Sequence, residues 1–314
     1  MLKLELTTSP TLGPTLPRLR MLKPCADRTL PSGLRRSRSE ELDSLARLGT
    51  WEVVQGLPAG AKALNHKWVH KVKFEDGKPV RYKSRLTVMG CAQREGIDFT
   101  ETFSPVARLA NLRLILALGV TEGFHYWQLD VSNVFPNANV EEVIFMRPPK
   151  ELRLPANSFL RLLKALYGLK QASHMWHNLV SSILVAHLFK KLQTDSCIFI
   201  HRWDAGRVII IVLYVEDIVI AATHKEDIIN IVAIIESHFK ITQRPMEFVL
   251  GVKVSDSRAV DGCIRLDLNA YTRMVLDRHA DLLRSLARST LSFYSTRSRH
   301  ATKQGNATTN SGRS

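Results

Sequence analysis

Two adjacent carboxylates, Glu216 and Asp217, interrupt the most apolar part of the sequence. The runs on either side, Val208 to Leu213 and Ile218 to Ala222, are short and rich in β-branched residues, a pattern typical of two buried strands joined by a tight turn. Because burial of an ionised carboxylate is costly unless a cation meets it, a bound metal ion would explain the pair. The alternative is a polar hairpin tip exposed to solvent, and a third carboxylate elsewhere in the chain would decide between the two.

The charge of the chain favours a polyanionic partner. The 314 residues carry a formal net charge of +15, while 45% hydrophobic and 23% charged residues are ordinary for a globular protein. Each phosphate that a basic protein neutralises releases condensed counterions, so nucleic acid is the natural partner, although basic tails alone would also raise the charge.

The four cysteines share no C-x-x-C spacing, which indicates neither a zinc site nor a disulfide framework and fits a reducing intracellular location. No apolar run approaches the ~20 residues of a membrane span, so we expect no membrane partner.

Both ends of the chain have the composition of disordered basic segments. Residues 1–38 are rich in Pro, Ser, Leu and Arg and show no sustained period, and residues 281–314 are rich in Ser, Arg, Thr and Asn. Ser39, followed by Glu40 and Glu41, has the pattern of a capped helix start. We therefore expect the ordered domain to begin at residue 39.

A basic β-hairpin is predicted between residues 67 and 88. Residues 67–74 alternate in the manner of a strand, an Asp-Gly pair marks a turn, and residues 80–88 return. Lys83 and Arg85 lie on one side of the returning strand because side chains alternate. Two cations at this spacing can hold a phosphate chain, and the alternative is a solvated strand face.

The third carboxylate is Asp130. It lies in the strand-like run Tyr126 to Phe135 among apolar neighbours, where an Asp without a partner would be costly. The alternatives are a hydrogen-bonded Asp at a strand end and, for Phe135, a core aromatic.

A helix is predicted over residues 111–123, ending at Gly123.

Several motifs in this order resemble the reverse transcriptase domain of copia-type LTR retrotransposons, over roughly residues 50 to 280. That family shows RYKARLV, GIDY, ETFAPVA, QLDVKNAFLNG, KALYGLKQAPRAW and YVDD. The matching segments here are RYKSRL (81–86), GIDF (96–99), ETFSPVA (101–107), QLDVSNVF (128–135), KALYGLKQASHMW (164–176) and YVED (214–217).

The resemblance implies an α+β fold of the right-hand polymerase type, with fingers, palm and an incomplete thumb. The reverse transcriptase domain would span residues 39–280, with fingers at about 50–125 and 145–175, palm at about 126–144 and 176–255, and a partial thumb at 256–280. Such a domain would be part of a longer polyprotein. It would lie in the cytoplasm or nucleus, and in a virus-like particle in an active element.

The resemblance also implies an RNA-directed DNA polymerase activity that needs two Mg²⁺ ions, or Mn²⁺. Asp130, Glu216 and Asp217 would be the catalytic metal ligands, since hard cations prefer carboxylate oxygens. Leu250 and Gly251, in a segment similar to the family's FLGIEI turn, would support the primer strand.

The implied substrates are an RNA or DNA template-primer and deoxynucleoside triphosphates. Lys83 and Arg85 would hold the triphosphate. Phe135 would exclude a ribose 2′-hydroxyl by steric clash, and Tyr167 and Gly168 would face the nucleotide or the template base. The sequence gives no signal for an oligomeric state.

Departures from the family pattern leave a second function open. Glu216 replaces the first Asp of YVDD, and its extra methylene moves the carboxylate by about 1 Å, a displacement that can cost about a hundredfold in rate. Pro136 would restrict Phe135 to extended backbone, and Ala138 would resist a positive φ. Together with Ser173, where the family has Pro, these changes favour a retrotransposon relic that binds nucleic acid without polymerising.

Overall fold

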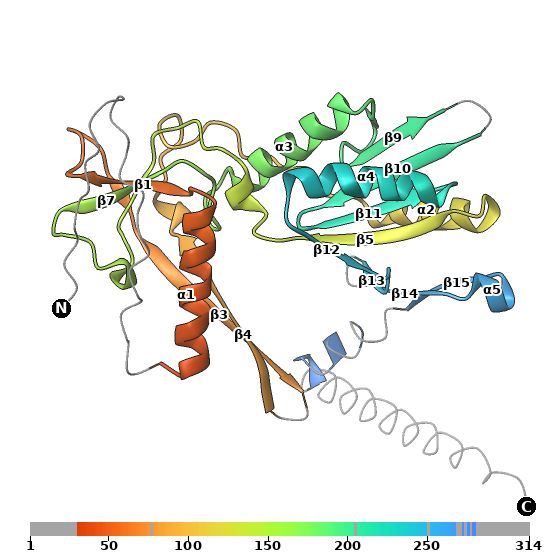
Figure 1. The fold of residues 1–314 in the computed structure, drawn as a ribbon, viewed down its shortest axis with the longest axis horizontal. Coiled ribbons are helices and arrows are strands. Elements are labelled where there is room, and N and C mark those ends of the chain that lie inside the picture. The colour runs from red at the N-terminus through yellow and green to blue at the C-terminus, as the bar shows by residue number, and fades with distance from the viewer. Residues whose placement is uncertain are drawn as a thin grey trace, which may run out of the picture. The chain divides into compact units, whose positions relative to one another are not determined.

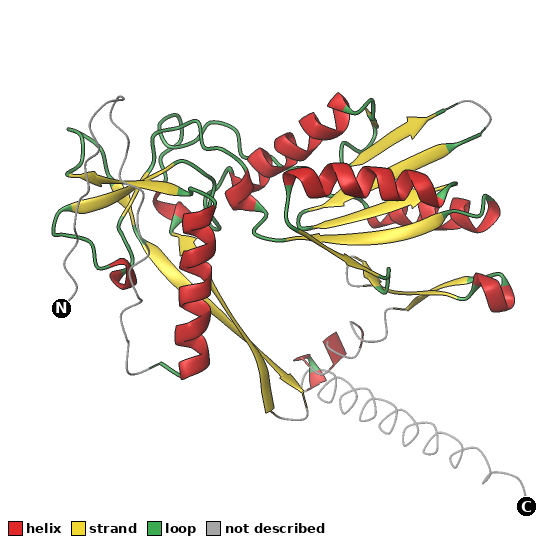
Figure 2. Cartoon of the chain, in the orientation of Figure 1, coloured by secondary structure: helices red, strands yellow, loops and turns green. Residues whose placement is uncertain are grey.

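The computed structural model describes residues 30–75, 78–203, 206–249 and 252–267, and residues 272, 275, 276 and 278–280. The chain divides into two compact units, residues 1–245 and residues 246–314 (Figure 1). Helices and strands are both abundant in the first unit (Figure 2), as the predicted α+β class requires.

The larger sheet of the first unit has six antiparallel strands in the order β12-β5-β11-β10-β9-β8. The two apolar runs around the carboxylates form its centre, as a hairpin of β10 (Val208–Tyr214) and β11 (Asp217–Ala222). The remaining strands are β5 (His125–Val131), β8 (Lys190–Lys191), β9 (Ile198–Arg202) and β12 (Ile241–Arg244).

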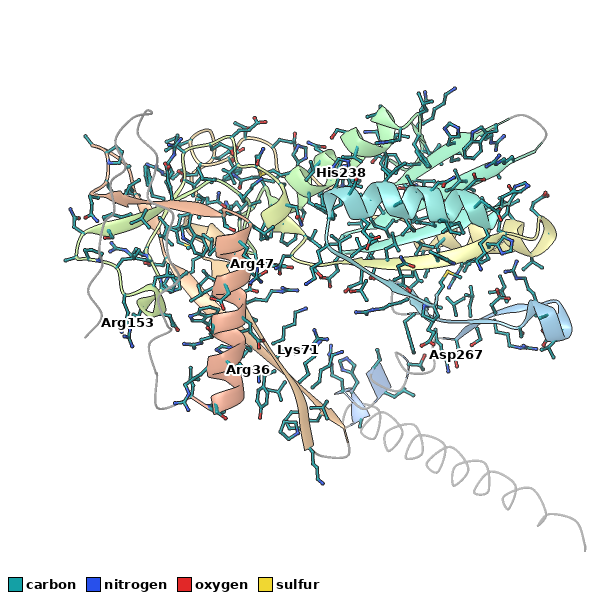
Figure 3. All side chains as sticks on the ribbon, in the orientation of Figure 1. Arg36, Arg47, Lys71, Arg153, His238 and Asp267 are labelled. Atoms are coloured by element: carbon teal, nitrogen blue, oxygen red, sulfur yellow. The ribbon has the colours of Figure 1, made fainter. Side chains whose placement is uncertain are left out.

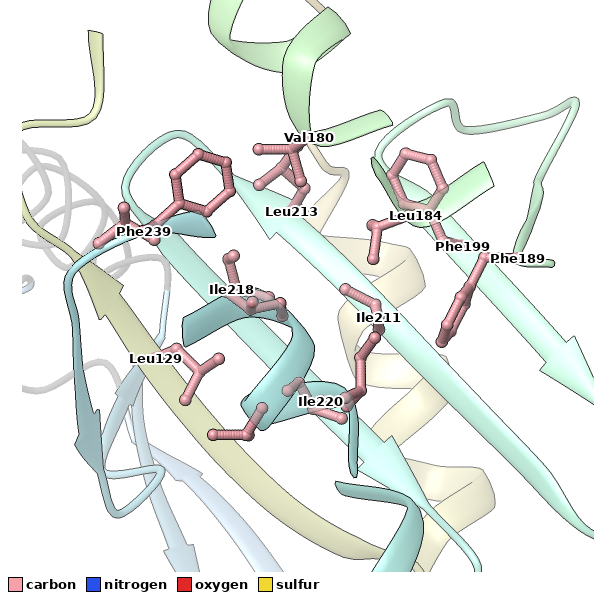
Figure 4. Close-up of a cluster of buried hydrophobic side chains, with 14 of the residues drawn as sticks. Leu129, Val180, Leu184, Phe189, Phe199, Ile211, Leu213, Ile218, Ile220 and Phe239 are labelled. Atoms are coloured by element: carbon pink, nitrogen blue, oxygen red, sulfur yellow. The ribbon is translucent and has the colours of Figure 1, made fainter. Parts of the chain in front are cut away.

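Helices cover both faces of this sheet, which is why its central strands are apolar on both sides. Helices α3 (Ala172–Ala186) and α4 (Lys225–His238) pack on one face, where Val180, Leu213 and Ile218 lie in one buried cluster (Figure 4). Helix α2 (Leu109–Thr121) packs on the other face, where the Tyr126 hydroxyl of β5 donates to main-chain carbonyls of the helix. The even-numbered residues of β5 share this second face because side chains alternate along a strand.

The smaller sheet of the first unit has the strand order β1-β7-β6-β2, and only β2 and β6 run parallel. Its strands are β1 (Trp51–Gln55), β2 (Ala63–Leu64), β6 (Phe145–Met146) and β7 (Ser158–Leu162). The separate hairpin of β3 (His66–Glu75) and β4 (Lys78–Val88) confirms the hairpin prediction. Three short 3-10 helices join these elements: η1 (Gly90–Ala92), η2 (Phe135–Asn137) and η3 (Lys150–Leu152).

Helix α1 (Ser32–Arg47) corrects the predicted start of the domain. It begins seven positions before the expected cap, and Ser39 lies inside it. Leu42 and Leu45 enter the core beside the smaller sheet, and Ser37 hydrogen bonds Ser84 of β4. The prediction of a disordered arm through residue 38 is therefore wrong for residues 32–38, because tertiary packing orders a segment whose composition alone does not.

The second unit contains a small sheet in the order β13-β14-β15. Its elements are β13 (Phe248–Val249), β14 (Val252–Asp256), α5 (Arg258–Asp261) and β15 (Ile264–Asp267). The division between the units falls after Pro245, ten residues before the predicted end of the palm at 255. Residues 1–29 and 281–314, predicted to be disordered, lie outside the described residues.

Candidate active site

Asp130 and Asp217 lie side by side on two inner strands of the six-stranded sheet, at the strand ends next to the carboxylate turn. They are direct partners in the register of β5 and β11, so their side chains share one face of the sheet. Gln128 Nε2 donates to Asp217 Oδ1 at 3.0 Å, and Arg244 Nη2 donates to Asp130 Oδ2 at 3.1 Å. Burial raises the pKa of Asp217, the negative charges of Asp130 and Glu216 raise it further, and the Gln128 hydrogen bond opposes the shift. Two like charges thus meet where a cation would be stabilised.

The turn that carries Glu216 is held in a strained backbone conformation. Val215 has φ of +51°, a region that costs a β-branched residue about 1–2 kcal/mol. Trp176 Nε1 of α3 donates to the Val215 carbonyl at 2.6 Å, and the Glu216 carbonyl accepts from the main-chain N–H of Val131 at 2.9 Å. These bonds tie the turn to α3 and to β5, and so fix its position relative to Asp130.

Arg85 connects the basic hairpin with the carboxylate hairpin. Its Nη2 lies 3.8 Å from Glu216 Oε2, and its guanidinium carbon lies 4.2 Å from the centre of the Tyr167 ring. Tyr167 in turn meets Phe135 edge to face, with the ring centres 4.7 Å apart. Burial raises the pKa of Tyr167, and its buried hydroxyl has no hydrogen-bond partner among the described residues. The sequence predicted these four side chains for one site, and the structure brings them together.

Lys83 belongs to the same charged group. Desolvation and the neighbouring charge of Arg85 lower the pKa of Lys83, while the negative charges of Glu216 and Asp130 raise it. The predicted alternation of Lys83 and Arg85 on one side of β4 is confirmed, because Ser84 between them is buried on the opposite side.

The face of the β3–β4 hairpin that carries Lys83 and Arg85 is rich in cations. Lys71 lies directly opposite Lys83, and Lys73 directly opposite Arg81, in the register of the two strands. Like charges in these positions repel one another across a strand pair. Lys71 projects from the hairpin in Figure 3. A row of cations without intervening carboxylates on this face suits a chain of phosphates.

A glycine is needed at position 168 for a close backbone contact that the sequence did not predict. Its φ is +91°, and a Cβ at this position would lie 2.1 Å from the carbonyl oxygen of Val88. The reciprocal holds for Gly90, whose Cβ would lie 2.0 Å from the Gly168 carbonyl oxygen. The close backbone approach therefore joins the Tyr167–Gly168 turn to the end of β4. The predicted contact of Gly168 with the nucleotide or template base stays a prediction.

The two backbone effects expected around Phe135 are absent. Phe135 begins the 3-10 helix η2 and is not extended, with Pro136 accommodated in the first turn. Ala138 has φ of −86°, so its position does not require a positive φ. Leu250 and Gly251, predicted to support the primer, lie outside the described residues.

The carboxylates fit a divalent cation only in part. Asp130 and Asp217 are direct partners on adjacent strands, so their carboxylate oxygens are available on one face of the sheet. Among the described residues, however, no group of three His, Cys, Asp or Glu side chains is arranged to hold a metal ion. Glu216, which is about half exposed, lies toward Arg85 instead. The two aspartates thus lie together while Glu216 lies near Arg85, and the set of three metal ligands stays a prediction.

The sequence did not predict three residues of this site. Gln128 had a usable signal, since it lies two positions before Asp130 and so on the same face of one strand. Nothing in the sequence indicates that the indole N–H of Trp176 reaches the turn at Val215. Arg244 had no signal, because its partner Asp130 is 114 positions away.

A central antiparallel hairpin bearing carboxylates, flanked by helices and by a basic hairpin, defines an α+β fold of the polymerase type. A family model described as reverse transcriptase (RNA-dependent DNA polymerase) matches residues 48–287, and the chain belongs to this family. The resemblance to copia-type reverse transcriptases is thereby confirmed.

Two curated relatives are polyproteins of plant transposons. The chain is 34% identical over 249 residues to the Retrovirus-related Pol polyprotein from transposon TNT 1-94 of Nicotiana tabacum, an alignment that covers 78% of this chain and 19% of the relative. It is 29% identical over 249 residues to the Retrovirus-related Pol polyprotein from transposon RE2 of Arabidopsis thaliana, which covers 78% of this chain and 17% of the relative. The chain thus spans less than a fifth of the length of these relatives.

Among solved structures, a foamy viral protease-reverse transcriptase in complex with double-stranded DNA is similar at a TM-score of 0.36 and 13% identity, over 76% of this chain and 36% of that chain. Within the part of this chain that the structure describes, no helix combines the length and apolar character needed to cross a membrane.

Proposed function

We propose that this chain is an RNA-directed DNA polymerase domain of a copia-type polyprotein, which adds deoxynucleotides to a primer 3′-hydroxyl on a nucleic-acid template. The observation that carries the proposal is the pairing of Asp130 with Asp217 on adjacent central strands, beside a hairpin with a cationic face. Membership of the reverse transcriptase family supports it. The predicted location, cytoplasmic or nuclear, stays a prediction.

Asp130 and Asp217 are the residues that would hold metal. Two Mg²⁺ ions, or Mn²⁺, would activate the primer hydroxyl and stabilise the leaving pyrophosphate. Glu216 would complete the predicted set of three ligands only by leaving Arg85, from which it now lies 3.8 Å. The reacting phosphate would then lie beside this carboxylate pair, at the strand ends next to the turn.

The remaining residues of the site would position the incoming nucleotide. Arg85 and Lys83 would hold the triphosphate, since both already interact with the carboxylates of the site. Tyr167 fixes Arg85 by stacking and fixes Phe135 by an edge contact. Phe135 would thereby present a rigid wall to the sugar and exclude a 2′-hydroxyl.

One observation favours a second function, the binding of nucleic acid without polymerisation. Glu216 pairs with Arg85 in the structure and does not join the two aspartates. If this pairing persists with substrate bound, the cationic hairpin would still bind phosphate while the metal site stayed incomplete.

Primer extension on an RNA template, with Mg²⁺ and separately with Mn²⁺, tests the two functions. The variants are Asp130→Ala and Glu216→Asp, and Glu122→Gln, an exposed carboxylate beyond α2, is the control. Extension by wild type and by the control, abolished in Asp130→Ala, would support the polymerase. Two results would support the binding function. One is no extension by wild type with extension restored in Glu216→Asp, and the other is no extension by any of the proteins with salt-sensitive RNA binding retained.

A further inference from the structure

Arg244 lies against one of the two aspartates of the site. Strand β12 runs beside β5 with Thr242 opposite Asp130 and Arg244 opposite Gln128, so Arg244 shares the face on which Asp130 projects. Its Nη2 is 3.1 Å from Asp130 Oδ2. Asp130 therefore lies between a like charge on β11 and an opposite charge on β12.

Each carboxylate of the site has a different polar partner. Asp217 accepts from the neutral Gln128 amide, and Glu216 lies near Arg85 at 3.8 Å. Arg244 makes the shorter of the two guanidinium contacts and makes it to a residue of the aspartate pair. Lys83 acts on Asp130 through its charge alone, since no hydrogen bond or ion pair joins the two.

The Arg244 side chain is free to move away from Asp130. It is 54% exposed, against 30% for Asp130, so the guanidinium can turn into solvent without burial of an uncompensated charge. A cation at Asp130 would otherwise stand only a few ångströms from the guanidinium, where the two positive charges repel. Arg244 therefore behaves as an exchangeable counter-ion of the site.

We infer that Arg244 competes with the divalent cation for Asp130 and so sets the metal affinity of this site, an inference that rests on the proposed function. Loss of the guanidinium removes both the ion pair that metal must break and the repulsion that metal must overcome. A partly exposed pair contributes little by itself, and repulsion of a divalent ion adds a comparable amount. We expect metal to bind about tenfold more tightly without Arg244.

The test is a titration of the full chain with Mn²⁺ at constant ionic strength, with free Mn²⁺ measured by electron paramagnetic resonance. Arg244→Gln removes the charge and Arg244→Lys retains it. Arg161→Gln is the matched control, because Arg161 makes an ion pair of 2.9 Å with Glu52 at similar exposure, on the smaller sheet. We expect Kd to fall about tenfold in Arg244→Gln, to stay near the wild-type value in Arg244→Lys, and to be unchanged in the control.

Tighter binding is informative because damage to the fold would weaken the site. An unchanged or higher Kd in Arg244→Gln would overturn the inference, as would an equal fall in the control. Asp130→Asn and Asp217→Asn separate this failure from that of the proposed function. If both lower Mn²⁺ affinity while Arg244→Gln leaves it unchanged, the aspartate site stands and Arg244 has no part in it; if neither lowers it, the metal site itself is wrong.

Discussion

Replacement of Gly168 by alanine should destabilise the protein strongly, because two separate costs coincide there. The residue has φ of +91°, and positive φ costs a residue with a Cβ about 1–2 kcal/mol. The added Cβ would lie 2.1 Å from the Val88 carbonyl oxygen and 2.7 Å from Thr87 Cγ2, so the Tyr167–Gly168 turn must move away from β4. Overpacking of this kind costs about 1–3 kcal/mol. We expect Gly168→Ala to lower the free energy of unfolding by about 2–5 kcal/mol.

Urea unfolding of the full chain measures this loss, and Gly123→Ala provides the matched control. Gly123 has φ of +68°, but a Cβ there would meet nothing within 4 Å. The control should therefore lose only the backbone cost of about 1–2 kcal/mol. Equal losses in the two variants would refute the argument, since they would show that the turn and β4 are not in close contact. The same displacement would move Tyr167 from beneath Arg85, so weaker triphosphate binding should accompany the loss.

Three further predictions concern Trp176, which contacts the carboxylate turn, and His70 and Lys71 of the β3–β4 hairpin. Trp176→Phe removes the donor to the Val215 carbonyl and should lower kcat of primer extension about tenfold or more; an unchanged kcat would contradict a positioning role. Burial, and then the charge of Arg38, lower the pKa of His70 in the folded protein. The contribution of His70 to the free energy of unfolding is therefore fully present above the ordinary pKa of 6.5 and is lost as pH falls through the lowered folded-state pKa. His70→Gln should flatten this loss in urea unfolding at several pH values, and an unaltered pH dependence would count against the argument. Lys71→Ala should reduce the slope of log K against log salt for RNA binding by about 0.7–0.9, and an unchanged slope would show that this residue contacts no phosphate.

The sequence predicts the carboxylate hairpin well because the signal is local. Two β-branched runs and a short polar break leave few alternatives to a buried hairpin, and the structure confirms β10 and β11. The β3–β4 hairpin is confirmed for the same reason, since alternation and an Asp-Gly pair lie within a few residues of each other.

The start of α1 could not be predicted, because its first turns are ordered by contacts distant in sequence. Arg38 bonds Glu151 at 2.6 Å and His70 at 3.1 Å, and its guanidinium lies over the Trp68 ring. Pro31 at the helix start makes no side-chain cap, so the usual N-terminal signal is missing. An Arg-rich segment of this kind looks disordered until its partners are known.

The partners of the site carboxylates also depend on tertiary structure. The strand order β12-β5-β11 brings Arg244 and Asp217 to opposite sides of Asp130, and no local pattern encodes that order. Likewise, the contact of Arg85 with Glu216 joins two hairpins more than a hundred residues apart in the sequence. The motif resemblance identified which residues belong together, whereas the structure shows that Glu216 faces an arginine.

Template-directed incorporation of a single nucleotide tests the central claim most directly. A primer annealed to RNA is offered each of the four deoxynucleoside triphosphates separately, with Mg²⁺ or Mn²⁺, and the product is resolved at one-nucleotide resolution. We predict addition of only the nucleotide complementary to the next template base, and none by Asp217→Asn. Addition that ignores the template base, or that survives in Asp217→Asn, would contradict a polymerase built on the Asp130–Asp217 pair.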